Sequence, residues 1–165
     1  MPVVSNTSPI LNLAIIGQLD LLREQFAEVL IPPAVLTELK PQIDFPGSAS
    51  VQRALETQWL RVVELTGVHL SQALMLELDN GEAAAIALAL ELDIRQILID
   101  ERDGRTKAKA LGLQPVGVLG ILLRAKRDGA LNSVEPAAYA LRQEAGFFIA
   151  EDLLEAILVE AGERG

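Results

Sequence analysis

The sequence has no cysteine and only one histidine, His69. Without thiols it can form neither a disulfide nor a thiolate metal site, and it has no cysteine nucleophile. A single histidine also gives little support to a histidine-pair metal site or a Ser-His-Asp triad. We expect His69 to lie in a loop or on the surface, and we look among oxygen ligands for any metal site.

Aromatic residues and long apolar runs are also scarce. Aromatic side chains make up 4% of the chain, and Trp59 and Tyr139 are too isolated to form a stacking platform for bases. No apolar run reaches the roughly 18 residues that a membrane span needs. The N-terminal segment lacks the basic start and uninterrupted apolar stretch of a signal peptide. We therefore expect a soluble, cytoplasmic protein that does not bind a membrane.

Positive charge is in short supply over the chain as a whole but is locally concentrated. The net charge of −9 argues against a protein that coats nucleic acid. Half of the 14 Lys and Arg residues nevertheless lie between Arg102 and Arg127, where Asp103 is the one acid. Such a run forms either ordinary solvated helix faces or a surface for a nucleic-acid backbone.

Short apolar segments alternate with helical patterns along the whole chain. Half of the 165 residues are apolar, enough for one domain with a buried core, residues 1–165. The alternation predicts an α/β fold, a three-layer α/β/α sandwich around a parallel sheet of four to five strands. The predicted strands are Val3 to Ser5, Val29 to Ile31, Leu60 to Leu65, Ile97 to Ile99 and Pro115 to Val118.

Helix-start signals accompany these strands. Ser8 followed by Pro9 predicts a helix that begins there, and Asn80 predicts the N-cap of a nearly all-apolar central helix, Glu82 to Leu92. Residues 41–50 show no periodic pattern, and we expect a loop there.

Polar side chains gather where the strands are expected to end. Asn6 follows the first strand, Glu38 lies in the helix after the second, Glu82 opens the central helix and Asp100 ends the fourth strand, with Asp103 close behind. Taken alone, each acid is more typical of a helix cap or a solvated turn than of a site. In a parallel sheet, however, these strand ends share one edge, where ligands bind. Such oxygen ligands suit Mg²⁺ or Mn²⁺, which can activate water against a phosphodiester.

Five segments resemble proteins of the PIN-domain family, most closely a branch with an S-N-T-S-P motif near the N-terminus. In chain order these are VVSNTSPILNLAIIG, IPPAVLTE, LDNGEAAAIALAL, ILIDERDGR and GVLGILLRAK, and they span essentially the whole chain. The resemblance implies a parallel sheet between helices and an acidic pocket that holds Mg²⁺ or Mn²⁺. It further implies a ribonuclease that cuts RNA, typical of toxins in toxin–antitoxin pairs, so an antitoxin protein becomes a possible partner.

The resemblance also assigns roles to residues. The family's second, third and fourth acids fall on Glu38, Glu82 and Asp100, with Asp103 as an alternative to Asp100, and its hydroxyl residue falls on Thr7 or Ser8. The predicted catalytic residues are Glu38, Glu82, Asp100 and Asn6, and the predicted metal ligands are Glu38, Glu82, Asp100 and Asp103. The predicted RNA contacts are Arg102, Arg105, Lys107, Lys109, Thr7 and Ser8.

Two positions depart from the family pattern. Asn6 stands where the family has its first aspartate; its amide carbonyl can ligate a metal, but it carries no charge and cannot act as a base. Glu82 stands where the family usually has aspartate. Two functions therefore stay open, an endoribonuclease and a PIN-like domain that binds RNA or protein without cutting. A phosphoacceptor receiver domain fits poorly, because Asn6 stands alone and Leu65-Thr66-Gly67 ends the third strand.

The last predicted helix, Glu151 to Glu160, carries a wide apolar stripe. Leu153, Leu154, Ile157 and Leu158 lie on one side of it. The stripe predicts a homodimer interface, or else it closes the core of the monomer.

Overall fold

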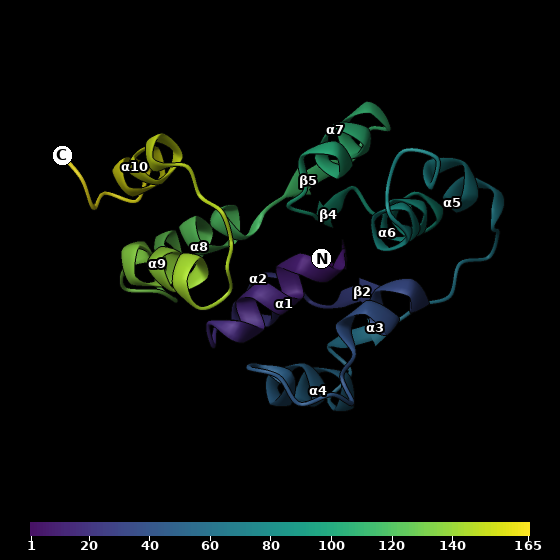
Figure 1. Cartoon of the computed structure of the whole chain (residues 1–165), viewed down its shortest axis with the longest axis horizontal. Coiled ribbons are helices and arrows are strands. Elements are labelled where there is room, and N and C mark those ends of the chain that lie inside the picture. The colour runs from purple at the N-terminus through teal and green to yellow at the C-terminus, as the bar shows by residue number, and fades with distance from the viewer.

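Five short strands form one all-parallel sheet in the order β3-β2-β1-β4-β5 (Figure 1). The structure, a computed structural model, describes the whole chain, residues 1–165. The strands are β1 (Val3–Ser5), β2 (Val29–Ile31), β3 (Leu60–Val62), β4 (Gln96–Leu98) and β5 (Gln114–Val116). The prediction of a parallel sheet within an α/β/α sandwich is confirmed.

β3 is shorter than predicted because its neighbour in the sheet ends. Ile31 pairs with Val62, and the Val63 N–H donates to the Ile31 carbonyl at 2.9 Å. Beyond Ile31 the neighbouring chain reaches Pro32, which has no N–H to continue a ladder, and turns into a helix. β4 and β5 each begin one residue earlier than predicted, and Val118 starts a helix rather than ending β5.

Ten helices surround the sheet. They are α1 (Thr7–Ile15), α2 (Asp20–Gln25), α3 (Pro33–Leu39), α4 (Ser48–Glu56), α5 (His69–Leu74), α6 (Asn80–Glu91), α7 (Arg102–Ala110), α8 (Val118–Arg127), α9 (Val134–Gln143) and α10 (Glu151–Glu160). His69 is exposed at the start of α5, as predicted. None of the ten combines the length and the apolar composition that crossing a bilayer requires.

Strand residues point alternately into two cores, one on each face of the sheet. Val3 belongs to the core that α1, α8, α9 and α10 cover, and Val4 to the core under α5, α6 and α7. Figure 1 shows α8 to α10 gathered at one end of the molecule and α5 and α6 at the other. Helix α6 is buried at every position from Gly81 to Ala89, since it packs on β1, β4, α3, α5 and α7 at once. This surrounding explains why its sequence is apolar on every side.

Three helix starts differ from the predictions. Asp79, not Asn80, caps α6: its carboxylate accepts from the Glu82 N–H at 2.8 Å and the Glu82 carboxylate accepts in return from the Asp79 N–H. Helix α1 starts at Thr7, with Asn6 as the extended residue before it, so Ser8 is not the cap. Helix α4 starts at Ser48, inside the predicted loop, after Gly47 turns the chain with a φ of 94°.

The apolar stripe of α10 belongs mostly to the monomer. Leu154, Ile157 and Leu158 are buried in the core shared with α8 and α9, whereas Leu153 is 46% exposed. The alternative that the stripe closes the monomer core therefore accounts for these three residues. The homodimer stays a prediction.

Candidate functional site

The strand order places a topological switch point between β1 and β4. From β1 the chain builds outward through β2 and β3, then returns to the other side of β1 to form β4 and β5. Ligands of open parallel sheets bind in the crevice outside the carboxyl ends of the strands at such a point. Asn6 directly follows β1, and its N–H donates to the Leu98 carbonyl at 2.9 Å; Asp100 lies just after β4. Asn6 and Asp100, predicted as site residues, thus border the crevice.

Both side chains end in a buried oxygen without a hydrogen-bond partner. These atoms are Asn6 Oδ1 and Asp100 Oδ2, and the Ser8 hydroxyl nearby on α1 is also unpartnered. Asn6 is only 4% exposed. A buried acceptor without a donor is costly, and such atoms in folded proteins usually mark the place of an ordered water or an ion. Amide and carboxylate oxygens are suitable ligands for Mg²⁺ or Mn²⁺, so the donor chemistry of this crevice fits a hard cation.

The second carboxylate oxygen of Asp100 is held from α8. Asp100 Oδ1 accepts from the Val118 N–H at 2.9 Å. A Cβ at position 117 would lie 2.7 Å from this oxygen, so the approach needs Gly117. Burial raises the pKa of Asp100 to about 6, although the Val118 hydrogen bond and the positive charge of Arg105 both oppose that rise.

Glu82 sits in an acidic hollow beside α7. It is 6% exposed, and it lines a pocket of about 240 Å³ together with Asp79, Glu101, Arg102 and Asp103. Burial raises the pKa of Glu82 to about 7; the charge of Asp79 raises it further, while the Asp79 N–H lowers it. Perturbed carboxylates in a hollow are typical of functional sites, although the reciprocal cap of α6 also uses this side chain. Asp79 and Glu101 were not predicted as site residues from the sequence.

Glu38 reaches the same region from α3. Its carboxylate accepts a short hydrogen bond of 2.5 Å from the Thr7 hydroxyl. It also packs so tightly on the backbone of α6 that a Cβ at position 81 would overlap it. Gly81 therefore lets Glu38 lie beside the first turn of the helix that carries Glu82.

The predicted metal ligands surround the crevice without forming one cluster. No group of three or more acidic or histidine side chains lies close enough to hold an ion together. Glu38 lies against Gly81. Glu82 and Asp103 line the acidic hollow, whereas Asp100 lines a different pocket. A metal shared by these four carboxylates thus stays a prediction.

Some of the predicted RNA contacts are exposed, and others already make contacts within the protein. Arg102 and Lys109 are exposed on α7. Arg105 donates to the Ile99 carbonyl at 3.0 Å, and Lys107 pairs with Glu77 at 2.6 Å. Thr7 and Ser8 point inward, Thr7 toward Glu38. The assignment of these six residues to RNA remains a prediction.

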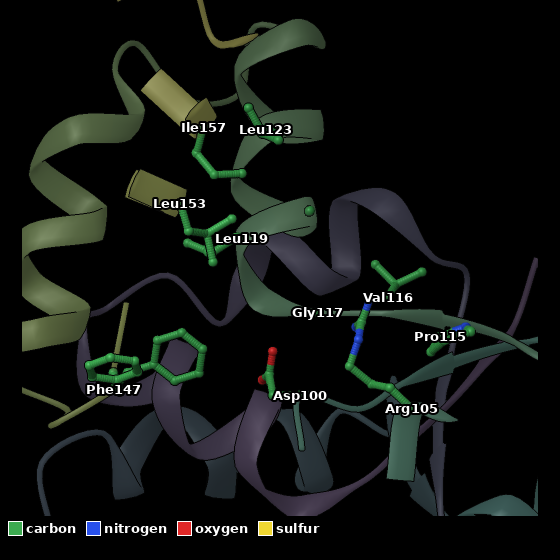
Figure 2. A pocket seen from close by; sticks show the side chains of 12 residues that line it. Asp100, Arg105, Pro115, Val116, Gly117, Leu119, Leu123, Phe147, Leu153 and Ile157 are labelled. Atoms are coloured by element: carbon green, nitrogen blue, oxygen red, sulfur yellow. The ribbon is translucent and has the colours of Figure 1, made fainter. Parts of the chain in front are cut away.

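A larger pocket adjoins Asp100 on the side of α8. It measures about 500 Å³, and Figure 2 shows the Asp100 carboxylate between Phe147 on one side and Arg105 on the other. Leu119, Leu153 and Ile157 line its upper wall in the same view. Phe148, also part of the lining, was missed by the sequence reasoning, although two adjacent phenylalanines after Gly146 in a chain with only four were a usable signal.

Comparison with known proteins identifies a family. Comparisons with curated proteins and with solved structures gave no match. A sequence model of the PIN domain matches residues 2–163, nearly the whole chain. The five-stranded parallel sheet between helices is the arrangement that this family implies. The chain therefore belongs to the PIN-domain family.

Proposed function

We propose that the protein is a metal-dependent endoribonuclease whose site lies at the switch point between β1 and β4. The family supports this coarsely, since PIN domains have a nuclease-like fold, generally use divalent metals and typically bind nucleic acid. The observation that carries the proposal is the pair of buried, unpartnered oxygens, Asn6 Oδ1 and Asp100 Oδ2, on adjacent strand ends. As in toxins of toxin–antitoxin pairs, an antitoxin protein would then be a partner.

Asp100 and Asn6 would hold the ion, because their free oxygens border the crevice and need a partner. Glu38 and Glu82 flank them and would hold water molecules of the hydrated ion, since Mg²⁺ usually keeps several of its waters. When bound, a Mg²⁺ or Mn²⁺ ion supplies an activated water and neutralises charge on the phosphodiester.

The reaction would be hydrolysis of the phosphodiester, with the RNA held by side chains of the chain itself. Hydrolysis adds water across the phosphodiester: an oxygen–phosphorus bond forms, the bond from phosphorus to the 3′ oxygen breaks, and a 5′-phosphate and a 3′-hydroxyl remain. Arg102, exposed in the first turn of α7, and Lys109, exposed in its last turn, would contact the RNA backbone. Thr7 holds Glu38 in place through its hydroxyl.

The test is RNA cleavage by purified protein with a mixed pool of single-stranded RNA, in Mn²⁺ or in EDTA. Wild type is compared with Asp100→Asn, Glu82→Gln and Asn6→Asp, and with Glu24→Gln as a control that removes one exposed acid on α2. We expect cleavage with Mn²⁺ that disappears in EDTA, falls by about 100-fold or more in Asp100→Asn and Glu82→Gln, and is unchanged in Glu24→Gln. Equal activity of wild type and Asp100→Asn would contradict the proposed site.

A second candidate function is an RNA-binding PIN domain that does not cut. The observation that favours it is Asn6, which leaves the crevice one negative charge short of the family pattern. The same assay separates the two functions. Cleavage by Asn6→Asp but not by wild type would show that the natural protein binds RNA without cutting it.

A further inference from the structure

The pocket beside Asp100 combines polar and apolar walls, as ligand pockets usually do. Asp100 and Arg105 stand at one end, beside Pro115 and Val116 of β5, and leucine, isoleucine and phenylalanine side chains from α8, α10 and the segment 146–149 form the opposite walls (Figure 2). Its volume of about 500 Å³ lies within the range of small-ligand sites. The proposed cleavage chemistry uses Asp100 but no other part of this pocket.

Phe148 is the most exposed apolar side chain that lines this pocket. It is 85% exposed, whereas its neighbour Phe147 is half-buried against the main core. Both phenylalanines also line a second hollow of about 640 Å³ on their other side, next to Arg142 and Ile149. Phe148 is thus left in solvent between two hollows, next to the partly exposed Leu153 of the first, and the packing of the monomer does not explain this exposure.

Gly120 keeps one side of the pocket open. It is an exposed residue of α8, and a Cβ there would meet only Val116 Cγ1, at an ordinary contact distance of 3.5 Å. The fold therefore does not require glycine at this position, and a glycine there makes the helix less stable than another residue would. A side chain at position 120 would instead project into the space of the pocket.

We propose that this pocket binds one unstacked base of a single-stranded RNA, with Phe148 as the stacking surface, next to the phosphodiester at the metal site that Asp100 would form. The inference rests on the proposed function and deepens it by adding a site for the base. Bases stack on exposed aromatic rings whatever their identity, so the pocket would accept many sequences. Arg105, fixed by the Ile99 carbonyl, would face the base edge or its phosphate from the polar end.

A base fits these walls better than a peptide does. A stable protein interface covers about 800 Å² on each partner, with an apolar centre depleted of charge. Here the apolar lining is interrupted at one end by the carboxylate of Asp100 and the guanidinium of Arg105. A base, in contrast, needs one aromatic face and polar groups at its edge. The shared wall at Asp100 also makes the pocket continuous with the proposed cleavage site.

The test measures RNA binding in EDTA, where cleavage cannot interfere, by fluorescence anisotropy of a labelled single-stranded oligoribonucleotide. A matched oligonucleotide with abasic sites has the same backbone without bases. The variants are Phe148→Ala, Phe148→Trp and Gly120→Leu. Leu76→Ala is the control, since Leu76 is equally exposed at 86% and follows α5, far from the pocket (Figure 1).

We expect Phe148→Ala to weaken RNA binding by about 5- to 100-fold, the range for losing one stacked base, and Phe148→Trp to retain it. Gly120→Leu should weaken it by filling the pocket, and Leu76→Ala should bind as wild type does. Binding of the abasic oligonucleotide should be weak in wild type and insensitive to Phe148→Ala. Thermal unfolding of each variant checks the fold, which does not depend on a side chain as exposed as Phe148.

The outcomes separate this inference from the proposed function. If wild type cleaves RNA with Mn²⁺ while Phe148→Ala and Gly120→Leu bind like Leu76→Ala, the base pocket is wrong and the nuclease stands. If wild type binds RNA through Phe148 but never cleaves, the pocket stands and the nuclease is wrong. No RNA binding and no cleavage overturns both. Unchanged RNA affinity together with loss of a co-purifying protein in Phe148→Ala assigns the pocket to a protein partner instead and overturns the inference.

Discussion

Asn6 sets how much negative charge the crevice between β1 and β4 carries. Its amide oxygen is buried and unpartnered beside the strand end that carries Asp100. Changing the amide to a carboxylate would add a charge without adding bulk. The effect should depend on whether a cation is present, because two neighbouring buried carboxylates repel each other unless something positive lies between them.

We predict that Asn6→Asp lowers the melting temperature in EDTA and tightens Mn²⁺ binding by about tenfold or more, since ligand charge tunes the affinity of such sites. Added Mn²⁺ should then restore the melting temperature, as for any ligand that binds only the folded state. Calorimetric titration and thermal unfolding measure the two effects. Asn132→Asp, which adds the same charge at an exposed position, is the control. Equal Mn²⁺ responses in both variants would place the ion elsewhere.

Glu163 illustrates a charge that stabilises the fold rather than the site. Burial alone would raise the pKa of Glu163, but hydrogen bonds from Lys126, Val134, Glu135 and Ser133 outweigh it and lower the pKa from 4.5 to about 2. The carboxylate thereby caps the N-terminus of α9 from the C-terminal tail, where a negative charge is favoured.

We predict that Glu163→Gln lowers the free energy of unfolding by about 1–2 kcal/mol at neutral pH, the usual range for charge-assisted hydrogen bonds. Because the folded-state pKa is depressed, this contribution is fully present above pH 4.5 and is lost as the pH falls toward about 2. Urea unfolding at several pH values measures the difference. Glu160→Gln, at an exposed position of α10, is the control. A difference that stays constant down to pH 2 would show that the charge is not responsible.

At the scale of the element, two glycines near the start of α8 have opposite roles, Gly117 at its N-cap and Gly120 in its first turn. A Cβ at Gly117 would collide with the Asp100 carboxylate, whereas a Cβ at Gly120 would meet only open space and one methyl group of Val116. We predict that Gly117→Ala destabilises the protein by about 1–3 kcal/mol through overpacking, and that Gly120→Ala stabilises it by about 0.5–1 kcal/mol through helix propensity. Chemical unfolding of the pair measures both, and equal effects would contradict the assigned positions.

The elements also show what the sequence could predict. Apolar runs such as Val29 to Ile31, punctuated by Pro32, predicted strands and the parallel α/β/α architecture, because their burial on both faces leaves a local signal. The end of β3 could not be read locally, since it depends on where the neighbouring β2 stops. Asp79 was passed over as a cap because the adjacent Asn80 has the same propensity, and only the reciprocal bond to Glu82 separates them.

The candidate site was less predictable than the fold for a related reason. Sequence placed Asn6 and Asp100 at the correct strand ends. It could not give the order of strands, which makes β1 and β4 neighbours and defines the switch point. Nor could it give side-chain directions: Glu82 turns toward Asp79 and Asp103, while Asp100 turns toward α8. These directions follow from long-range packing, which no local pattern encodes.

At the scale of the whole molecule, the association state remains a prediction. Leu154, Ile157 and Leu158 are used within the monomer and Leu153 lines the proposed base pocket, so a homodimer would have to rest on other exposed apolar side chains of α10, such as Val159. We predict that sedimentation at tens of micromolar shows a species of twice the 17.8 kDa chain mass, and that Val159→Glu reduces it to the monomer. A single 17.8 kDa species in wild type would remove the dimer.

The distribution of charge over the whole molecule limits how it can hold RNA. The net charge is −9, and of the seven basic residues between Arg102 and Arg127, three are paired with acids: Lys107 with Glu77, Arg124 with Asp128 and Lys126 with Glu163. Four side chains of this run make no ion pair, Arg102, Arg105, Lys109 and Arg127, and Arg127 lies at the far end of α8 from Asp100, which leaves three for phosphate contacts near the site. Affinity must therefore come from the site and the base pocket more than from a general electrostatic field.

We predict a shallow salt dependence of RNA binding: about three phosphate contacts give a slope of log K against log salt near −2 for a single strand. Arg102→Ala and Lys109→Ala should each reduce this slope by about 0.7, whereas Arg124→Ala should leave it unchanged, because Arg124 already pairs with Asp128. Anisotropy titrations over a range of KCl concentrations measure the slope. A slope steeper than about −5 would require a basic surface that this chain does not present, and would point instead to a second protein supplying the cations.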